Sequence, residues 1–299
     1  MTNAVSETES IPKLWTTLVR EVEADMSRRL DLALVPDTLR DAMRYALFGG
    51  GKRLRPLLTL MSCEAVGGDR TDAFAAAGAL ELIHTFSLIH DDLPAMDDDA
   101  LRRGQPTLHL HAGEAMAILA GDCLHALAFE WVAAAPVPAE VVAPLGRELA
   151  GATVAMIAGQ VYDTLGGFAE AVTPRDRLES IHRHKTTALL RAAVRMGGLC
   201  GGADEKQLGA LTAYGEAIGT MFQIVDDLLD VTQTTEHLGK TAGKDQQAGK
   251  LTWPGLHGAE ASHAAVERLH RESREALEVL GEPARHLGEL CDYMAVRTR

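Results

Sequence analysis

The sequence predicts an all-α protein with about ten helices in one domain. Three observations support this fold class. Ala, Leu and Gly dominate over Val, Ile, Thr and Tyr, and aromatic residues make up only 4% of the 299 residues, a composition that favours helices over strands. Segments of helical length are separated by runs of glycine. No segment shows the sustained alternation of apolar and polar residues that is typical of a β-strand.

The helices follow one another with short connections. Glycine runs at 49–51, 67–68 and 166–167 separate successive apolar segments. At 173–176 the sequence Thr-Pro-Arg-Asp predicts a helix start, because a capping hydroxyl precedes proline at the first helical position and an acid near the third. Thr71, followed by Asp72, marks another start. We expect helices over 12–34, 37–48, 53–66, 72–93, 113–134, 138–165, 174–198, 204–232, 262–281 and 283–297.

A single domain over residues 1–299 fits this pattern best. The length alone would allow two domains, but 46% hydrophobic residues can also fill one large core. No linker or low-complexity tract divides the chain. The stretch from Thr232 to Pro254 is the one long segment without clear periodicity. A loop of that length inside a compact domain is more often functional than idle.

The charge balance excludes polyanionic partners. With 42 acidic residues against 29 Lys and Arg, the formal net charge is −13, whereas proteins that bind nucleic acid or anionic membranes carry basic faces. The longest mainly apolar uncharged run, 149–162, is shorter than the roughly 18 residues that a membrane span requires. We therefore expect no nucleic-acid partner and no membrane span.

The cysteines and the first residues predict a cytoplasmic location. Cys63, Cys123, Cys200 and Cys291 are far apart in sequence, without the short spacing of a zinc or redox motif. They are expected to be reduced thiols. The N-terminal residues carry acids and hydroxyls where a secretory signal would place a basic stretch and then an apolar one.

An acidic cluster follows one predicted helix. In the sequence DDLPAMDDD, Asp91 and Asp92 precede Pro94, and Asp97 begins a further run of aspartates. Proline disfavours helical geometry at the residue before it, so the helix should end or kink at Leu93. Carboxylates near the negative end of a helix are unfavourable unless a cation compensates them.

A second acidic cluster, DDLLD, lies within the predicted helix 204–232. Asp226 and Asp230 are four residues apart and share a helix face, among apolar neighbours. A solvated acidic face would explain one such cluster. Two clusters that each end an apolar segment favour a hard cation, and Mg²⁺ in particular combines one or two carboxylates with waters and phosphate oxygens. Neither cluster has the ligand spacing of a calcium loop.

Cationic groups that could hold phosphate oxygens occur elsewhere. Lys52, Arg53 and Arg55 follow the glycine run 49–51 and open a helix, where backbone N–H groups already favour anions. Further cations are Arg102, Arg103, Lys185, Lys240, Lys244 and Lys250. Because the sequence contains no nucleotide-binding GxxxxGK[ST] motif, the two acidic clusters and these cations together predict chemistry on diphosphates.

The chain resembles the trans-polyprenyl diphosphate synthase family, specifically bacterial short-chain farnesyl and geranylgeranyl diphosphate synthases. The resemblance runs from about Gly49 to the C-terminus, and it is carried by GGGKRLRP, ELIHTFSLIHDDLPAMDDDALRRGQPT, GQVYD, IHRHKT, FQIVDDLLD and LGKTAGKDQQAGKLTWP. It implies a single helical bundle around a deep central cavity, a homodimer, and the condensation of isopentenyl diphosphate with an allylic diphosphate. Ala158 and Ala100 depart from the family pattern at positions outside the ligand set.

The resemblance also assigns roles by position. It implies that three Mg²⁺, or alternatively Mn²⁺, bind Asp91, Asp92, Asp97, Asp226 and Asp230. The implied donors to the allylic diphosphate are Arg102, Lys185, Lys240 and Lys250. The implied isopentenyl diphosphate site contains Lys52, Arg55, His84 and Arg103, although a helical histidine such as His84 is often only a core residue. Thr186 and Gln223 match positions that line the reacting centre.

The product length is expected to depend on residues before the first aspartate cluster. Phe86 and Ser87 lie five and four residues before Asp91, and five residues of helix span roughly 7 to 8 Å, on the scale of one or two isoprene units. A large ring at Phe86 resembles synthases that stop at the C15 product, with C20 as the closest rival. A class I terpene cyclase and a noncatalytic partner subunit are the remaining alternatives. The second diphosphate site argues against the cyclase, and the intact aspartate motifs argue against the noncatalytic subunit.

Overall fold

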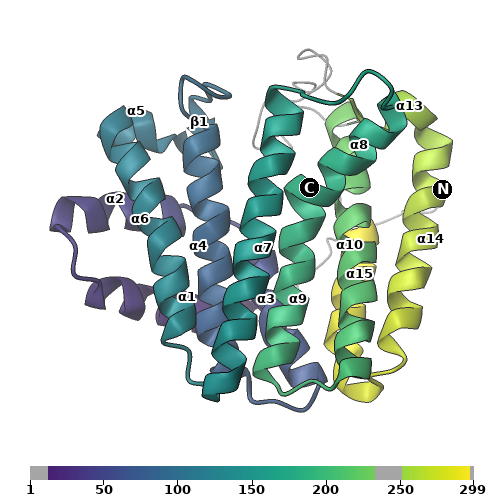
Figure 1. The fold of residues 1–299 in the computed structure, drawn as a ribbon, viewed down its shortest axis with the longest axis horizontal. Coiled ribbons are helices and arrows are strands. Elements are labelled where there is room, and N and C mark those ends of the chain that lie inside the picture. The colour runs from purple at the N-terminus through teal and green to yellow at the C-terminus, as the bar shows by residue number, and fades with distance from the viewer. Residues whose placement is uncertain (1–12, 233–250, 297–299) are drawn as a thin grey trace, which may run out of the picture.

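The computed structural model describes residues 13–232 and 251–296, and it is almost entirely helical. Long helices stand side by side as an upright bundle (Figure 1). The α-helices are α1 (Lys13–Leu32), α2 (Asp37–Phe48), α3 (Leu54–Ala65), α4 (Phe74–Asp91), α5 (Leu108–Ala112), α6 (Glu114–Ala133), α7 (Ala139–Thr164), α8 (Pro174–His182), α9 (Ala188–Cys200), α10 (Glu205–Thr232), α13 (Trp253–His257), α14 (Ala259–Leu277) and α15 (Arg285–Val296). Short 3₁₀ turns at Arg70–Ala73 and Glu282–Ala284 precede α4 and α15.

The all-α prediction is confirmed, and every expected helix has a counterpart within a few residues of its predicted bounds. The segment expected as one helix over 174–198 is instead α8, a π-helical turn at Arg183–Thr187 and α9, which ends at Cys200. In that turn the Ala188 N–H donates to the Arg183 carbonyl, five residues back. Periodicity cannot reveal such a turn, because the apolar pattern continues on both sides of it.

A small β-hairpin was not expected. Its strands, β1 (Leu101–Arg102) and β2 (Gln105–Pro106), pair in antiparallel register. The two residues between them, Arg103 and Gly104, have φ angles of 55° and 79°. Two successive positive φ values are typical of the type I′ turn that closes tight hairpins. The hairpin carries Arg102 at the end of β1 and Arg103 in the turn.

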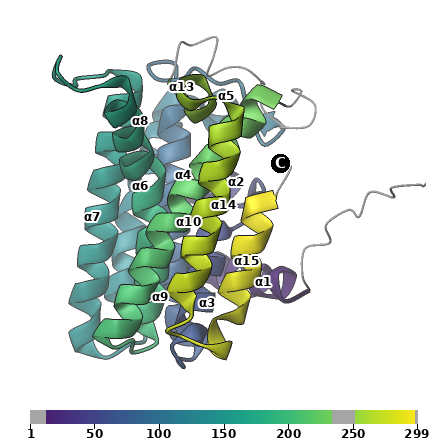
Figure 2. The ribbon, with the colours of Figure 1, turned by 90° about the vertical axis from the view of Figure 1, so that its right-hand side faces the viewer.

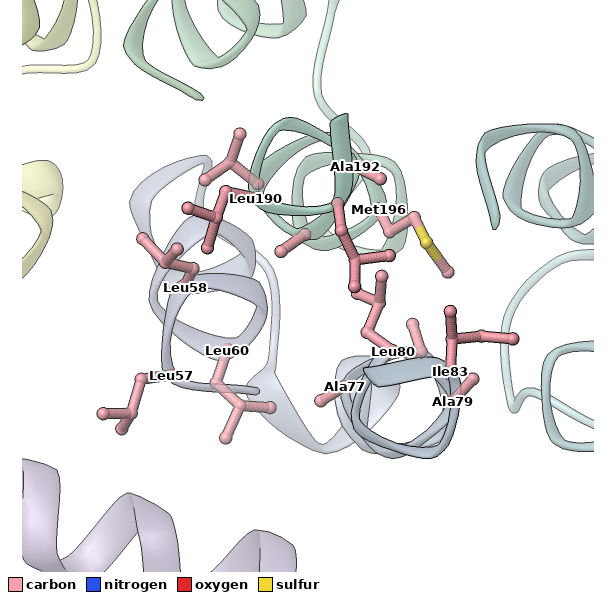
Figure 3. Packing of buried hydrophobic residues seen from close by; sticks show 14 of the residues in the cluster. Leu57, Leu58, Leu60, Ala77, Ala79, Leu80, Ile83, Leu190, Ala192 and Met196 are labelled. Atoms are coloured by element: carbon pink, nitrogen blue, oxygen red, sulfur yellow. The ribbon is translucent and has the colours of Figure 1, made fainter. Parts of the chain in front are cut away.

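The core of the bundle lies where α3, α4 and α9 pack together (Figure 3). Leu58, Leu80 and Leu190 represent the three helices there, and all are almost completely buried. Close approach depends on Gly197 of α9, where an added Cβ would lie 2.1 Å from the Thr59 carbonyl oxygen of α3. Because α4 is apolar nearly all round, it can occupy the centre of the bundle, and its C-terminal end is thereby fixed in position.

Three helical segments are long and apolar enough to cross a membrane when only length and composition are considered: Arg70–Asp91, Glu114–Ala133 and Ala139–Thr164. The sequence analysis expected no membrane-length segment because it considered only uncharged runs, and each of these three segments contains a few charged residues. The first is 72% buried inside the fold, whereas the third is only 28% buried. The central segment therefore owes its hydrophobicity to the core, and α6 and α7 leave apolar surface uncovered.

Several short elements gather at one end of the bundle. The β-hairpin, α5, α8 and α13 all lie at the upper end in two views at right angles (Figures 1 and 2). The C-terminal end of α4, with the first aspartate cluster, runs directly into this region. The predicted site residues are therefore expected at this end.

Candidate active site

The first aspartate cluster closes the C-terminal end of α4. The helix ends at Asp91, and the chain then folds back so that the Asp97 N–H donates to the Asp91 carbonyl oxygen at 2.8 Å. The Asp98 N–H donates to the Leu93 carbonyl oxygen at 3.2 Å. These bonds satisfy carbonyl groups that a helix end leaves open, and they bring Asp97 next to Asp91. The five residues between the two aspartates provide the length for this return.

The carboxylates of this cluster are partly shielded from water. Burial raises the pKa of Asp91 to about 6, against the opposing effect of the Lys185 charge, and Asp97 raises it further. Burial also raises the pKa of Asp92, which lies in an ion pair with Arg102. Arg102 donates in addition to Asp99 at 3.3 Å. The predicted metal ligand Asp92 and the predicted diphosphate donor Arg102 are therefore partners of each other.

The donor set fits a hard cation such as Mg²⁺. Asp226 and Asp230 of α10 supply the second pair of carboxylates, and Asp230 is buried. Within the part of the chain that the structure describes, no three acidic, histidine or cysteine side chains form a metal site by themselves. Mg²⁺ takes one or two protein carboxylates and completes its shell with waters and substrate phosphate oxygens, so the aspartate side chains match its preferred donors.

The π-helical turn carries Lys185 and Thr186. The Lys185 Nζ donates to Asp163 of α7 at 2.6 Å. The turn is packed tightly against α7 at Gly159, where an added Cβ would lie 2.3 Å from the Lys185 backbone nitrogen. A side chain larger than that of glycine at position 159 would therefore push the turn away from α7. π-turns occur frequently at functional sites, and this one places Lys185 close enough to influence the Asp91 carboxyl.

Thr186 and Gln223 are brought together, as their shared prediction requires. The Thr186 hydroxyl donates to the Gln223 Oε1 at 2.8 Å. The Gln223 Nε2 donates to Asp227 at 3.0 Å, and Asp227 also accepts the backbone N–H of Trp253 at 2.8 Å. The sequence analysis assigned no role to Asp227. Its spacing of four residues from Gln223 on α10 was the available signal.

A cavity of about 520 Å³ contains the four residues predicted to bind isopentenyl diphosphate. Lys52 and Arg55 border it from the start of α3, His84 from α4 and Arg103 from the hairpin turn. The rest of the wall is mainly apolar, but it also includes two further charged side chains, Arg53 and Glu81. The apolar side chains are Trp15, Val19, Leu54, Leu57, Phe222, Leu290, Tyr293 and Met294. A cationic end next to an apolar wall suits a ligand with an anionic head and a hydrocarbon tail.

The charges in this cavity lower each other's pKa values. Burial lowers the pKa of Arg55 to about 10, with Arg103 acting in the same direction and Glu81 opposing. The Arg55 Nε is buried without a hydrogen-bond partner. Burial lowers the pKa of His84 well below its usual value, and the nearby arginines Arg55 and Arg103 lower it further. Glu81 also lines this cavity, but it is paired with Arg53, so an incoming anion would add favourable negative charge next to Arg55, His84 and Arg103.

His84 should make the fold sensitive to acid. Its imidazole takes up a proton in the unfolded chain as the pH falls through about 6.5 but resists protonation in the folded state. The unfolded state therefore binds more protons, and stability is lost below that pH. We expect the melting temperature to fall less from pH 7.5 to pH 5.5 in His84→Gln than in the wild type, as measured by thermal unfolding. His263→Gln, at an exposed position on α14, should lose as much as the wild type, and an equal loss in His84→Gln would contradict the assignment.

Arg53 and Glu81 support this cavity. Arg53 was counted in sequence among the cations that could hold phosphate oxygens, whereas Glu81 was assigned no role. Arg53 is 2% exposed, and its guanidinium donates to Glu81 at 2.8 Å, Glu23 at 2.8 Å and the Leu47 carbonyl oxygen at 2.7 Å. It therefore ties the start of α3 to α1, α2 and α4. Glu81 gave no signal in sequence, because it is one polar residue in an otherwise apolar stretch.

Arg53→Met is expected to destabilise the protein by about 3–5 kcal/mol, because it leaves the Glu81 carboxylate buried without its partner. The Arg53→Met/Glu81→Met double variant should recover most of that loss, since apolar side chains of similar volume replace the buried pair. Urea unfolding of the three proteins measures this. A double variant no more stable than Arg53→Met would show that Arg53 acts through its other bonds.

The two predicted chain-length residues lie on different sides of α4. Phe86 is buried, and its ring contacts His90 on α4 and His125 on α6 with centroid distances of 5.7 and 4.9 Å. The His125 ring in turn contacts Phe129 at 5.4 Å. Ser87 is half-buried and donates to the His84 carbonyl oxygen at 2.9 Å. The ring of Phe86 thus closes the space between α4 and α6 about one and a half turns below Asp91.

Lys240 and Lys250, predicted to bind the allylic diphosphate, lie outside the described residues, as does Lys244. Apart from Phe86 and Ser87, the other predicted site residues are divided between two regions. One region contains the first aspartate cluster with Arg102 and Lys185, and it continues through Thr186 to Gln223 on α10, the helix that carries the second cluster. The other is the cavity with Lys52, Arg55, His84 and Arg103. The two regions adjoin, because the Asp226 carboxylate of α10 is close enough to raise the pKa of Arg55.

An all-helical bundle with paired aspartate clusters next to a cationic cavity is the architecture of an enzyme that acts on diphosphates. The sequence profile described as polyprenyl synthetase matches residues 36–282, and the chain belongs to this family of prenyltransferases.

Curated relatives include geranylgeranyl pyrophosphate synthases of plants. Geranylgeranyl pyrophosphate synthase 11, chloroplastic, of Arabidopsis thaliana is 50% identical over 274 residues, which covers 88% of this chain and 75% of the relative. The Capsicum annuum synthase of that name, also chloroplastic, is 45% identical over 288 residues and covers 93% of this chain and 78% of the relative.

Solved structures share both the fold and part of the sequence. A putative farnesyl-diphosphate synthase from Marinomonas sp. MED121 has a TM-score of 0.79 at 38% identity, and the match covers 95% of this chain and 98% of that one. Geranylgeranyl pyrophosphate synthetase from Pyrococcus horikoshii has a TM-score of 0.84 at 31% identity, with the same two coverages.

Proposed function

We propose that this protein condenses isopentenyl diphosphate with a short allylic diphosphate, dimethylallyl or geranyl, in a Mg²⁺-dependent reaction. The single observation that carries the proposal is the presence of two anion sites side by side. One is the aspartate region with Lys185 and Arg102, and the other is the cavity with Lys52, Arg55, His84 and Arg103. A terpene cyclase needs only the first site.

The reaction begins when the allylic C–O bond breaks and its electron pair leaves with the diphosphate. Lys185 and Arg102, which both act on the pKa of Asp91, are the cations that would stabilise the negative charge that develops there. Bound Mg²⁺ supplies additional charge stabilisation on the diphosphate oxygens. The positive charge develops on carbon, near the uncharged oxygen atoms of Thr186 and Gln223. The isopentenyl double bond then attacks that carbon and forms the new C–C bond, which leaves a cation on the isopentenyl unit. A carbon next to this cation loses a proton to the released diphosphate, and the new allylic double bond forms.

The apolar surroundings protect the cation from water. Buried apolar side chains stand close in sequence to the aspartates on α4 and α10, among them Ile89, Ile224 and Leu228. Water that reached the cation would capture it as an alcohol. The apolar helices that lead into charged ends therefore serve the chemistry as well as the core.

We propose that the main product is the C15 diphosphate, farnesyl diphosphate. The buried Phe86 ring, backed by His125 and Phe129, supports this length because it restricts the space below Asp91. A C20 product is the second candidate, since the plant relatives with 45–50% identity are named geranylgeranyl pyrophosphate synthases.

Incubation of the purified protein with dimethylallyl diphosphate, isopentenyl diphosphate and Mg²⁺, followed by chromatographic sizing, tests both statements. We expect a C15 diphosphate, no product when isopentenyl diphosphate is omitted, and no product in EDTA. A hydrocarbon or alcohol formed from the allylic diphosphate alone would identify a cyclase. The absence of every product would contradict the proposed function.

We also propose that two copies associate through the uncovered faces of α6 and α7. Exposed apolar side chains on these helices include Leu119 on α6 and Val154, Ile157 and Val161 on α7. The last three follow the spacing of one helix stripe, and a second copy would cover this apolar surface.

Val154→Glu/Ile157→Glu should shift the protein from dimer to monomer in sedimentation velocity, because it places two charges in the contact. Glu140→Gln on the same helix, at an exposed polar position, should leave the dimer unchanged. A monomeric wild type would contradict the proposal.

A cytoplasmic location is also proposed, supported by four cysteines that are unpaired in the structure.

A further inference from the structure

We propose that Asp227, the second aspartate of the DDLLD motif, is a positioning residue that sets the orientation of the Gln223 amide and, through it, of the Thr186 hydroxyl. The proposal rests on the proposed function, in which Thr186 and Gln223 line the reacting centre. Its evidence is a chain of hydrogen bonds that joins α10, the π-helical turn and the start of α13.

The contacts of Asp227 are all to donors. Its Oδ1 accepts from the Gln223 Nε2 at 3.0 Å, and its Oδ2 accepts from the Trp253 backbone N–H at 2.8 Å. The His182 Nε2 lies 3.4 Å from the same Oδ2. Asp227 is 4% exposed. Each oxygen of this buried carboxylate therefore accepts a hydrogen bond from within the protein.

The carboxylate decides which way the neighbouring amide points. An ionised aspartate only accepts hydrogen bonds, so the Gln223 side chain must turn its NH₂ group toward Asp227. The amide oxygen is then left facing the π-helical turn, where it accepts the Thr186 hydroxyl at 2.8 Å. The reverse orientation would place two acceptors together at Asp227.

The orientation of the amide fixes the Thr186 proton in turn. Because that hydroxyl donates to Gln223, its proton points toward Gln223 and its lone pairs point away from Gln223. Oxygen lone pairs stabilise a developing positive charge, whereas a hydroxyl proton would oppose it. Asp227 therefore contributes to the ionisation step without contact with the substrate.

The contacts of Asp227 distinguish it from the predicted metal ligands Asp226 and Asp230. At about 100° per residue, Asp227 points about 100° from Asp226 but only about 60° from Asp230, so helix geometry alone does not separate the three aspartates. The Asp227 carboxylate contacts His182 of α8 and Trp253 of α13. Asp227 is thus engaged in the hydrogen-bond chain, whereas Asp226 and Asp230 are the predicted metal ligands.

Asp227→Asn tests the proposal, because the amide offers Gln223 and Trp253 one acceptor and one unwanted donor. We expect kcat to fall by about tenfold or more, while the KM for the allylic diphosphate and the Mg²⁺ concentration for half-maximal rate change less than about twofold. Asp226→Asn is the matched comparison, and it should raise the Mg²⁺ requirement. An increase in Mg²⁺ requirement in Asp227→Asn as large as that in Asp226→Asn would overturn the proposal.

The polarity of the pair can also be exchanged. The double variant Gln223→Glu/Asp227→Asn places the carboxylate at position 223 and the amide at position 227. The carboxylate can then accept both from the new amide NH₂ and from the Thr186 hydroxyl, while the amide oxygen still accepts the Trp253 N–H. We expect the double variant to recover about tenfold in kcat over Asp227→Asn. Gln223→Glu alone should be impaired, since it places two carboxylates together. A double variant no better than either single variant would overturn the proposal.

Melting temperatures of the same four proteins provide a readout that does not need catalysis. The hydrogen-bond chain predicts that both single variants melt below the wild type and that the double variant melts above both. Recovery of melting temperature without any prenyl diphosphate product from the wild type would contradict the proposed function alone. Normal wild-type synthesis without recovery in the double variant would contradict the hydrogen-bond chain alone.

Discussion

Phe86→Ala is expected to lengthen the product from C15 to C20 and beyond. The substitution removes the ring that packs between α4 and α6, and it leaves the His125 ring in contact with Phe129 only. Chromatographic sizing of products at equal conversion measures the change. Some stability should be lost, about 3–5 kcal/mol for a buried phenylalanine truncated to alanine, so the assay belongs well below the melting temperature.

Phe74→Ala provides the matched control for this shift. Phe74 begins the same helix, twelve residues before Phe86, or about 18 Å along its axis, and it packs against the core. Its truncation should lower stability without lengthening the product. If Phe86→Ala made only the wild-type product, another side chain would have to limit the chain. A wild type that already makes C20 would move that limit deeper than Phe86.

Asp91→Asn is expected to reduce kcat by about a thousandfold or more, because it removes a carboxylate from the proposed Mg²⁺ site and metal stabilisation is worth several kcal/mol. The same change should raise the melting temperature of the metal-free protein at pH 7.5. Burial raises the pKa of Asp91 to about 6, so above that pH the folded state holds a carboxylate that the unfolded state solvates better. Activity assays and thermal unfolding in EDTA measure the two effects.

The comparison for Asp91→Asn is Asp98→Asn, in the same acidic run. Asp98 is exposed and has a φ of 47°, a conformation that asparagine tolerates as well as aspartate. It should keep nearly full activity and an unchanged melting temperature. Addition of Mg²⁺ and inorganic diphosphate should raise the melting temperature of Asp98→Asn but not that of Asp91→Asn. A Mg²⁺ response in Asp91→Asn equal to the control would exclude Asp91 as a ligand.

Much of the fold was predictable because helical signals are local. Glycine runs, the capped start at Thr173 and the proline at Pro94 each act within a few residues, and the predicted helices lie close to those of the structure. The hairpin was missed because it depends on two positive φ values at Arg103 and Gly104. The first of these carries a side chain that gives no such signal.

The charged residues of the candidate site were also identified in sequence, but their partners were not. Lys185 stands out in a motif, whereas its ion pair with Asp163 joins residues 22 positions apart. The same holds for Arg53 with Glu81 and for Trp253 with Asp227. Such pairs arise from the packing of helices, and a single sequence does not contain that information.

The π-helical turn at Arg183–Thr187 has a consequence for the register of the whole segment. Such a turn is equivalent to one extra residue inserted into a regular helix, so the face of α8 and the face of α9 are out of phase by about 100°. Deleting a single residue there would restore an ordinary helix, and it would rotate everything on one side by that angle. The orientation of Lys185 and Thr186 therefore depends on the rotation of about 100° that the π-helical turn introduces between α8 and α9.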